Sequence, residues 1–223
     1  MKIVAILASP HGRKGNTGRL LNHVLAGTKE EGAKTELFLL KYQEIAPCLG
    51  CNVCHIKGKC KQKDAFHALK EKILDAEGVI IASPNYIDNV SAQLKAFMDR
   101  CCGVVHLLSF EGRYGVAVVT SGGGPEKPIG EMIENFMIKT GIMPVGSVYA
   151  TMRTISGDEF PEETIGAANA LGRDLVRAIK EKRINGKAKK EMEKFRQRMK
   201  ELVEFRKDEW PYEWKYWQKR EER

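Results

Sequence analysis

The sequence lacks any apolar stretch that could cross a bilayer. Its longest apolar runs, such as residues 3–8, are far shorter than the about 20 residues that a transmembrane helix needs. The first eight residues carry one lysine and an apolar run too short for a secretory signal, and the polar residues 9–12 end that run. We therefore expect a cytoplasmic protein that does not associate with membranes.

Several common nucleotide-binding and catalytic patterns are missing as well. Residues 9–17 contain no Gly-Lys-Ser/Thr that would close a Walker A loop, and Gly12, Gly15 and Gly18 do not have the spacing of the dinucleotide fingerprint. No acidic residue ends the second predicted strand, where it would hold a ribose. No Ser–His–Asp or paired-carboxylate arrangement is recognisable, so we predict no catalytic acid, base or nucleophile among the side chains.

The chain also lacks internal repeats and low-complexity linkers. Its 223 residues, 43% of them hydrophobic, fit one domain with an extension. The net charge is +8, but residues 183–223 hold 14 Lys and Arg against 9 Asp and Glu, which places +5 of it in that stretch. The remainder is only mildly basic, and we expect no nucleic-acid partner.

Short apolar runs alternate with helical patterns along the chain. This alternation predicts a five-stranded, doubly wound parallel sheet covered by helices on both faces, with its ligand crevice at the carboxyl ends of the strands. Asp64 is predicted to cap one of the helices. The predicted strands are residues 3–8, 35–40, 79–82, 114–120 and 143–150, and the later helices are residues 90–102, 126–140 and 163–182.

Three polar loops follow strands one, three and four of this sheet. The first can hold a phosphate at the positive end of the following helix, and the other two can approach a flat ring system with backbone amides and an aromatic side chain. The candidate ligand-binding residues are Ser9, His11, Arg13, Asn16 and Thr17 in the first loop, Pro84, Asn85, Tyr86 and Ile87 in the second, and Ser121, Gly122, Gly123 and Gly124 in the third.

Residues 9–17 and 83–100, with Ser-Pro-Asn-Tyr at 83–86, resemble the NADPH-dependent FMN reductase group of flavodoxin-like proteins. The resemblance covers residues 1–150. It implies a flavodoxin-like α/β sheet with strand order 2-1-3-4-5, FMN in the three loops, and a homodimer or homotetramer. The family often has Arg directly after Ser-Pro, where this chain has His11 with Arg13 two residues on, so either side chain can be the one that meets the phosphate.

Four of the six cysteines fall within thirteen residues. Their spacing, C-x2-C-x2-C-x5-C, lets a short loop wrap a cuboidal [4Fe-4S] cluster, and it is similar to the iron-sulfur flavoprotein branch of the same family. Zinc in the same loop, free thiols without metal, or a disulfide are the alternatives. The predicted ligands are Cys48, Cys51, Cys54 and Cys60.

The neighbouring His55 is expected to be a solvated loop residue. Cys101 and Cys102 are expected to close a helix as small buried hydrophobic residues. We thus predict a flavin domain over residues 1–182, with the cysteine loop inserted at 41–63, and a C-terminal extension over 183–223.

The extension combines an apolar helical seam with an aromatic tail. Met192, Phe195, Met199 and Leu202 recur at helical spacing, and residues 210–217 hold five aromatic side chains, including every Trp. The tail either packs on its own domain, grips a second subunit or covers a cofactor; we favour the second subunit.

The sequence thus predicts an oxidoreductase that passes electrons between FMN, a [4Fe-4S] cluster and an NAD(P)H or ferredoxin donor, with a small molecule or a protein as acceptor. The alternatives are a cluster-free NAD(P)H:FMN or quinone reductase and a nucleic-acid-binding protein with a zinc-held loop.

Overall fold

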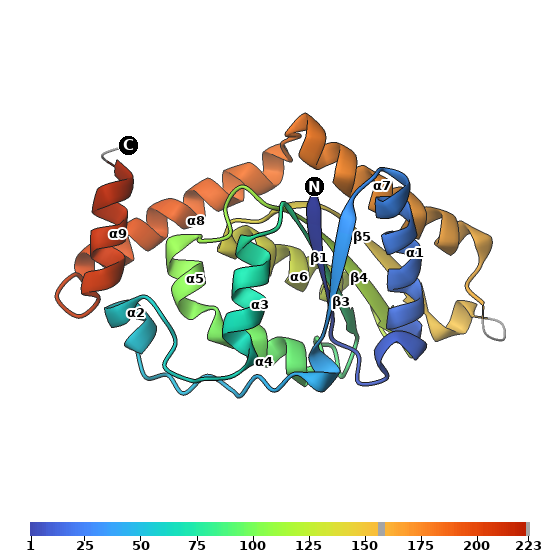
Figure 1. The fold of residues 1–223 in the computed structure, drawn as a ribbon, viewed down its shortest axis with the longest axis horizontal. Helices are drawn as coiled ribbons and strands as arrows, with labels where there is room; N and C mark the ends of the chain where they lie inside the picture. The colour runs from blue at the N-terminus through green and yellow to red at the C-terminus, as the bar shows by residue number, and fades with distance from the viewer. Residues whose placement is uncertain (156–158, 222–223) are drawn as a thin grey trace.

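A computed structural model describes residues 1–155 and 159–221 of the chain. Five parallel strands form one sheet in the order β2-β1-β3-β4-β5 (Figure 1). The predicted doubly wound sheet and its strand order are confirmed. The strands are β1 (Lys2–Leu7), β2 (Lys34–Leu39), β3 (Gly78–Pro84), β4 (Tyr114–Ser121) and β5 (Met143–Thr151).

Helices cover both faces of the sheet. The alternating side chains of β1 separate into two apolar clusters, one around Val4 and Ile6 and the other around Ile3, Ala5 and Leu7. All five residues are fully buried, which explains why β1 is a continuous apolar run. The first cluster includes side chains of α3 (Ala65–Leu74), α4 (Ala92–Arg100) and α6 (Lys127–Thr140), and the second includes side chains of α1 (Asn16–Glu30) and α7 (Glu162–Glu181).

The predicted helix over residues 90–102 is wrong at both ends. Ser91 is the N-cap of α4 and accepts a hydrogen bond from the N–H of Leu94 at 3.4 Å, so the helix begins at Ala92. The helix ends at Arg100, and after Cys101 the chain continues in a separate helix, α5 (Cys102–Leu107).

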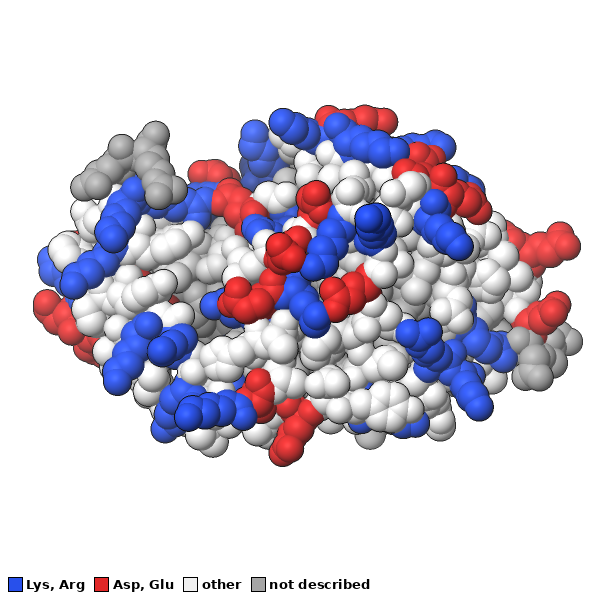
Figure 2. Space-filling view, in the orientation of Figure 1, with Lys and Arg blue, Asp and Glu red and all other residues white. Residues whose placement is uncertain are grey.

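No helix within residues 1–155 and 159–221 is long and apolar enough to span a membrane. Figure 2 shows acidic and basic side chains interspersed over the middle of one face of the molecule. That face therefore does not present a continuous basic surface of the kind that nucleic acids bind.

The apolar seam of the extension packs against its own chain. It belongs to α8 (Gly186–Phe205), which is followed by α9 (Pro211–Glu221). Met192 and Met199 of α8 join Leu107, Leu108 and Trp217 in a third buried cluster. The extension thus lies along α5 and α6 and brings α9 beside the cysteine loop (Figure 1).

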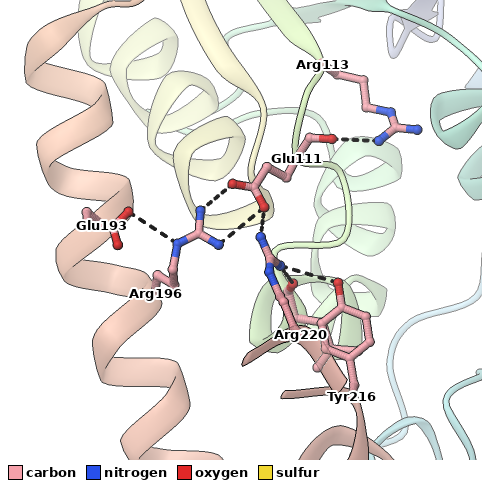
Figure 3. Close-up of polar contacts among 7 residues, drawn as sticks. Glu111, Arg113, Glu193, Arg196, Tyr216 and Arg220 are labelled. Carbon is pink, nitrogen blue, oxygen red and sulfur yellow. Dashed lines mark hydrogen bonds and ion pairs between the residues drawn. The ribbon is translucent and has the colours of Figure 1, made fainter. Parts of the chain in front are cut away.

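An ion-pair network around Glu111 holds this extension (Figure 3). The Glu111 carboxylate accepts hydrogen bonds from Arg196 of α8 and forms an ion pair with Arg220 of α9. Arg113 donates to the backbone carbonyl of Glu111 at 2.7 Å, and Arg196 also pairs with Glu193 at 3.3 Å. One carboxylate thus ties both helices of the extension to the loop after α5.

The cysteine loop is fixed to the domain by a buried ion pair. It runs from η2 (Leu40–Tyr42) to α3 and contains one short helix, α2 (Val53–Lys57). Arg100, whose side chain is fully buried, pairs with Asp64 at 2.7 Å. Arg100 donates to the backbone carbonyl of Ala46 at 2.8 Å, and Asp64 accepts from the N–H of Ala46 at 3.1 Å. Asp64 also accepts from the N–H of Phe66 at 3.1 Å, which confirms it as the cap of α3.

Replacing Asp64 by Asn should destabilise the protein by about 3 kcal/mol, because the variant leaves the buried Arg100 without its counter-charge. Asp99→Asn is the matched control, since Asp99 forms an exposed pair with Lys95 and should lose less than about 1 kcal/mol. Urea unfolding followed by circular dichroism measures both free energies. Equal losses in the two variants would contradict the structural role of the pair.

The same pair should make stability depend on pH at the acidic end. Burial alone raises the pKa of Asp64, but hydrogen bonds from Arg100 and from the N–H groups of Ala46 and Phe66 outweigh it, and the pKa lies below its ordinary value. The stabilisation is therefore complete above the unfolded-state pKa and is lost as the pH falls through the folded-state pKa. Urea unfolding between pH 6 and pH 3 should show a smaller decline for Asp64→Asn than for the unsubstituted protein.

Candidate functional site

The three predicted ligand loops meet at the carboxyl edge of the sheet. Thr17, at the start of α1, shares a hydrogen bond of 2.7 Å with the side chain of Thr120 near the end of β4. The N–H of Asn85, directly after β3, donates to the carbonyl of Thr120 at 2.7 Å. Thr120 is thus the point where the loops of β1, β3 and β4 are joined.

The loop after β1 leaves the start of α1 open to an anion. The N-cap residue is Gly15, no side chain caps the helix, and the first turn holds no acidic residue. Ser9 is buried and accepts a hydrogen bond from the N–H of His11 at 3.3 Å, so its side chain points back into the loop. A Cβ on Gly18 would lie 2.5 Å from the carbonyl of Gly12, which shows how closely the loop folds over the helix. Free N–H groups at a helix start favour phosphate.

Cationic side chains lie in this loop and beside the neighbouring loop of β4. Arg13 and Lys14 belong to the loop itself, in the short helix η1 (Gly12–Lys14). Lys41 lies beside Gly12, and Arg153 lies beside Gly123. In each case a Cβ added to the glycine would be 3.6 Å from the side chain, from Lys41 Cδ and from Arg153 Nε. The sequence did not single out Lys41 or Arg153, because each lies in a segment outside the three loops.

The segment after β5 is a fourth contributor to this edge. The side chain of Asn16 contacts the sulfur of Met152, which is exposed. Met152 and Arg153 lie in η3 (Met152–Thr154), directly after β5. A parallel sheet brings this strand end beside the loop of β4, so the position follows from strand order rather than from any local motif.

The loop after β3 contains an unsatisfied acceptor. Asn85 Nδ2 donates to the carbonyl of Pro125 at 3.1 Å, but its Oδ1 is buried and has no hydrogen-bond partner among the described residues. Leaving such a group unpaired costs about 1–3 kcal/mol. A polar ligand that donates a hydrogen bond at this position would remove that cost, so the residues present fit a flavin ring with its N–H groups.

The rest of the β3 loop is a tight turn that projects outward. The N–H groups of Tyr86 and Asn89 each bond to the other residue's carbonyl, at 2.8 and 3.2 Å. Between them, Ile87 and Asp88 have φ of 51° and 55°, in the left-handed region. Ile87 is fully exposed and Tyr86 is 44% exposed, so both offer apolar surface beside the edge.

The loop after β4 is held by Ser121. Its side-chain oxygen accepts from the N–H of Gly123 at 3.2 Å and also contacts Gly124 and Glu126. Gly123 has φ of 147°, which disfavours a side chain there. A Cβ on Gly124 would lie 3.3 Å from Asn85 Nδ2, so the loops of β3 and β4 are in contact.

The cysteine loop leaves the sheet after β2 and runs along the same edge of the molecule (Figure 1). Cys48 and Cys51 are exposed, while Cys54 and Cys60 are partly buried and line a cavity of about 80 Å³ with Arg100 and Tyr212. Tyr212 of α9 packs so closely on this loop that a Cβ on Gly58 would lie 2.2 Å from its ring.

Arg100 gives this loop a positive charge that suits thiolates. Burial lowers the pKa of Arg100, but Asp64 and Cys60 outweigh it and raise the pKa. Its Nε is buried and lacks a partner in the described parts of the chain. A free donor beside Cys60 can hydrogen-bond to ligand or cluster sulfur, and such bonds tune cluster potentials. The charge of Arg100 therefore suits thiolate ligands, while among the four cysteines only Cys54 and Cys60 line this cavity in the described part of the chain.

Two sequence expectations beside this loop are wrong. His55 is not solvated: it lies in α2, is 4% exposed, and donates from Nδ1 to Glu213 Oε1 at 2.7 Å. Cys102 is not a buried hydrophobic residue but is half-buried, with its sulfur 3.6 Å from His55 Nε2 and 3.9 Å from His106 Nε2. Cys101 is buried as expected, and burial raises the pKa of its thiol.

Glu213 organises this polar cluster. It is fully buried and also accepts from His106 Nδ1 at 2.9 Å. Hydrogen bonds from His106 and His55 outweigh burial and lower the pKa of Cys102 to about 6. Burial lowers the pKa of both histidines. Their hydrogen bonds to Cys102 and Glu213 outweigh this effect, so the pKa of each histidine is raised. Glu213 lies 158 residues after His55, so no local pattern could have paired them.

Comparisons with known proteins agree with this architecture. The chain is 35% identical over 185 residues to an iron-sulfur flavoprotein of Archaeoglobus fulgidus, with 82% of each chain covered. An NAD(P)H:quinone oxidoreductase from Methanothermobacter marburgensis has a similar fold, with a TM-score of 0.63 at 18% identity over 78% of this chain and 96% of that one. A flavodoxin from the Archaea has a TM-score of 0.54 at 15% identity over 81% of this chain and 99% of that one, which shows the flavodoxin-like fold.

The family model of NADPH-dependent FMN reductases matches residues 1–155. This region contains the three loops and the cysteine loop, whereas α8 and α9 lie beyond it. On this match, and on the 35% identity to an iron-sulfur flavoprotein over most of both chains, the protein belongs to the NADPH-dependent FMN reductase family of oxidoreductases.

Proposed function

We propose that the chain is an electron-transfer oxidoreductase that binds FMN at the carboxyl edge of the sheet and a [4Fe-4S] cluster at the cysteine loop, with NAD(P)H or ferredoxin as electron donor. The observation that carries the proposal is the unpaired Oδ1 of Asn85 beside an uncapped helix start, in three loops joined at Thr120. When bound, FMN exchanges two electrons as hydride or one at a time, and a cluster carries single electrons.

In this proposal the protein supplies binding and electrostatics. The N–H groups at the start of α1 bind the phosphate, together with Ser9, His11, Arg13, Asn16 and Thr17. Asn85 and the backbone of the other two loops bind the ring edge. The ring-binding residues are Pro84, Asn85, Tyr86, Ile87, Ser121, Gly122, Gly123 and Gly124.

The cluster ligands are the four cysteines of the loop. Cys48, Cys51, Cys54 and Cys60 supply the thiolates, and Arg100 offsets part of their charge. Because Cys48 and Cys51 are exposed, this side of the loop is open to solvent and to a redox partner. The relatives named iron-sulfur flavoproteins, one of them aligned over 82% of this chain, support the assignment.

The second candidate is a cluster-free NAD(P)H:FMN or quinone reductase. The exposure of Cys48 and Cys51 favours it, because thiols in that position are open to oxidation and to loss of metal. It uses the same flavin loops and differs only in what the cysteine loop holds.

The phosphate site can be tested by comparing FMN with riboflavin. Replacing both His11 and Arg13 by Ala should weaken FMN binding about tenfold or more, because charge-assisted hydrogen bonds to the phosphate are lost. Riboflavin, which lacks the phosphate, should bind the variant unchanged. Flavin fluorescence quenching measures both affinities.

Two further variants control this comparison. Lys29→Ala, at the opposite end of α1, should leave both affinities unchanged. Asn85→Leu should weaken both ligands equally, because it removes a contact to the ring rather than to the phosphate. The phosphate assignment would be wrong if the double variant weakened riboflavin as much as FMN.

The cluster can be tested by the iron content and absorption spectrum of anaerobically purified protein. We expect one flavin and about four iron atoms per chain. Cys51→Ser should lose the iron and keep the flavin, whereas Cys101→Ala should keep both, since Cys101 is buried in the core. Flavin without iron in the unsubstituted protein would support the cluster-free reductase instead.

A further inference from the structure

We propose that His55, Cys102 and His106 bind a single zinc ion, at a site separate from the four cysteines of the loop. The three side chains come from α2 and α5, and Glu213 of α9 supports them. They are the one group of His, Cys and carboxylate side chains in the described part of the chain that lies close enough to share an ion. This site does not depend on the proposed flavin chemistry.

The spacing of the ligand atoms fits tetrahedral coordination. The Cys102 sulfur lies 3.6 Å from His55 Nε2 and 3.9 Å from His106 Nε2, and all three atoms lie within 4.8 Å of one another. With Zn–S of about 2.3 Å and Zn–N of about 2.0 Å, tetrahedral angles separate sulfur and nitrogen by about 3.6 Å. The two imidazole rings are stacked, with centroids 4.7 Å apart and planes at 21°, so they must tilt until both Nε2 atoms face a common point to admit the ion.

Glu213 orients both imidazole rings for this purpose. Because each histidine donates from Nδ1 to a different oxygen of Glu213, at 2.7 and 2.9 Å, each ring leaves its Nε2 directed at Cys102. A carboxylate behind a metal-binding histidine is the usual support of zinc sites. Trp210 packs on both rings, with centroids 4.7 and 5.0 Å away, and restricts their rotation.

The ligand types also select zinc. Glu213 is fully buried and Cys102 is half-buried, so the ion would lie in a largely buried position beside the carboxylate that supports both imidazoles. One sulfur and two imidazole nitrogens suit a borderline cation such as Zn²⁺ rather than Mg²⁺ or Ca²⁺. A cuboidal iron-sulfur cluster, by contrast, is held by thiolates at separate corners, and this group offers one.

The ion would join three parts of the molecule. His55 lies next to Cys54 at the cysteine loop, Cys102 and His106 lie one helical turn apart on α5, and Glu213 belongs to the extension. Zinc at this point therefore fastens α2 and α5 directly and α9 through Glu213. The three protein ligands leave the fourth tetrahedral position to water, and the ion would hold the cysteine loop against the domain.

The test uses full-length protein purified anaerobically with its flavin and iron. After addition of one equivalent of ZnCl₂ and removal of free metal, we expect one zinc per chain by elemental analysis. Zinc K-edge X-ray absorption should show one sulfur at about 2.3 Å and nitrogen or oxygen ligands at about 2.0–2.1 Å. No retained zinc, or a shell of several sulfurs from the cysteine loop, would overturn the proposal.

Matched variants separate this site from the cluster. Cys102→Ser should lose zinc and keep iron, Cys51→Ser should lose iron and keep zinc, and Cys101→Ala should keep both. Glu213→Gln should weaken zinc about 10- to 100-fold in competition with a chromophoric chelator. Circular dichroism and flavin content establish that each variant is folded. Zinc retained by folded Cys102→Ser would overturn the proposal, and iron lost only in Cys102→Ser would assign the thiol to the cluster instead.

Discussion

The position of the cysteine loop depends on the ion pair between Arg100 and Asp64. Arg100 is anchored in α4, which packs on the sheet, and its side chain is fully buried. Together with Asp64 it binds both backbone groups of Ala46, fixes the start of α3, and places a positive charge beside Cys60. A single guanidinium thus connects the rigid flavodoxin-like core to a loop that otherwise has little regular structure.

The fold could be predicted from the sequence because its signals are local. Buried parallel strands appear as short apolar runs, and the loops that follow them carry the polar and glycine residues that a ligand edge needs. The prediction was wrong where a side-chain cap decided the outcome: Ser91 delays the start of α4, and the chain turns at Cys101 before α5. Likewise, Arg153 joins the edge only because β5 lies next to β4.

The cluster around Glu213 could not be predicted in the same way. His55 appeared to be a loop residue because the five residues of α2 are too few to give a clear helical pattern, and left-handed residues bound them at Asn52 and Gly58. The glutamate that binds it lies at the far end of the sequence. One local sign existed, since Cys102 and His106 are four residues apart and so share a face of a helix. This spacing points to a polar cluster only when His55 of α2 is known to lie beside the two residues.

The position of α8 and α9 at the end of the chain affects the order in which parts of the protein fold during translation. The 20 residues of α8 span about 30 Å and carry the chain from α7 to the cysteine loop, where Trp210 and Tyr212 cover α2. Translation proceeds from the amino end and domains tend to fold as they emerge, so the strands and the cysteine loop exist before the residues that cover them. Cys54 and Cys60, which share a cavity with Tyr212, therefore stay uncovered until α9 docks, whereas Cys48 and Cys51 are exposed both before and after docking.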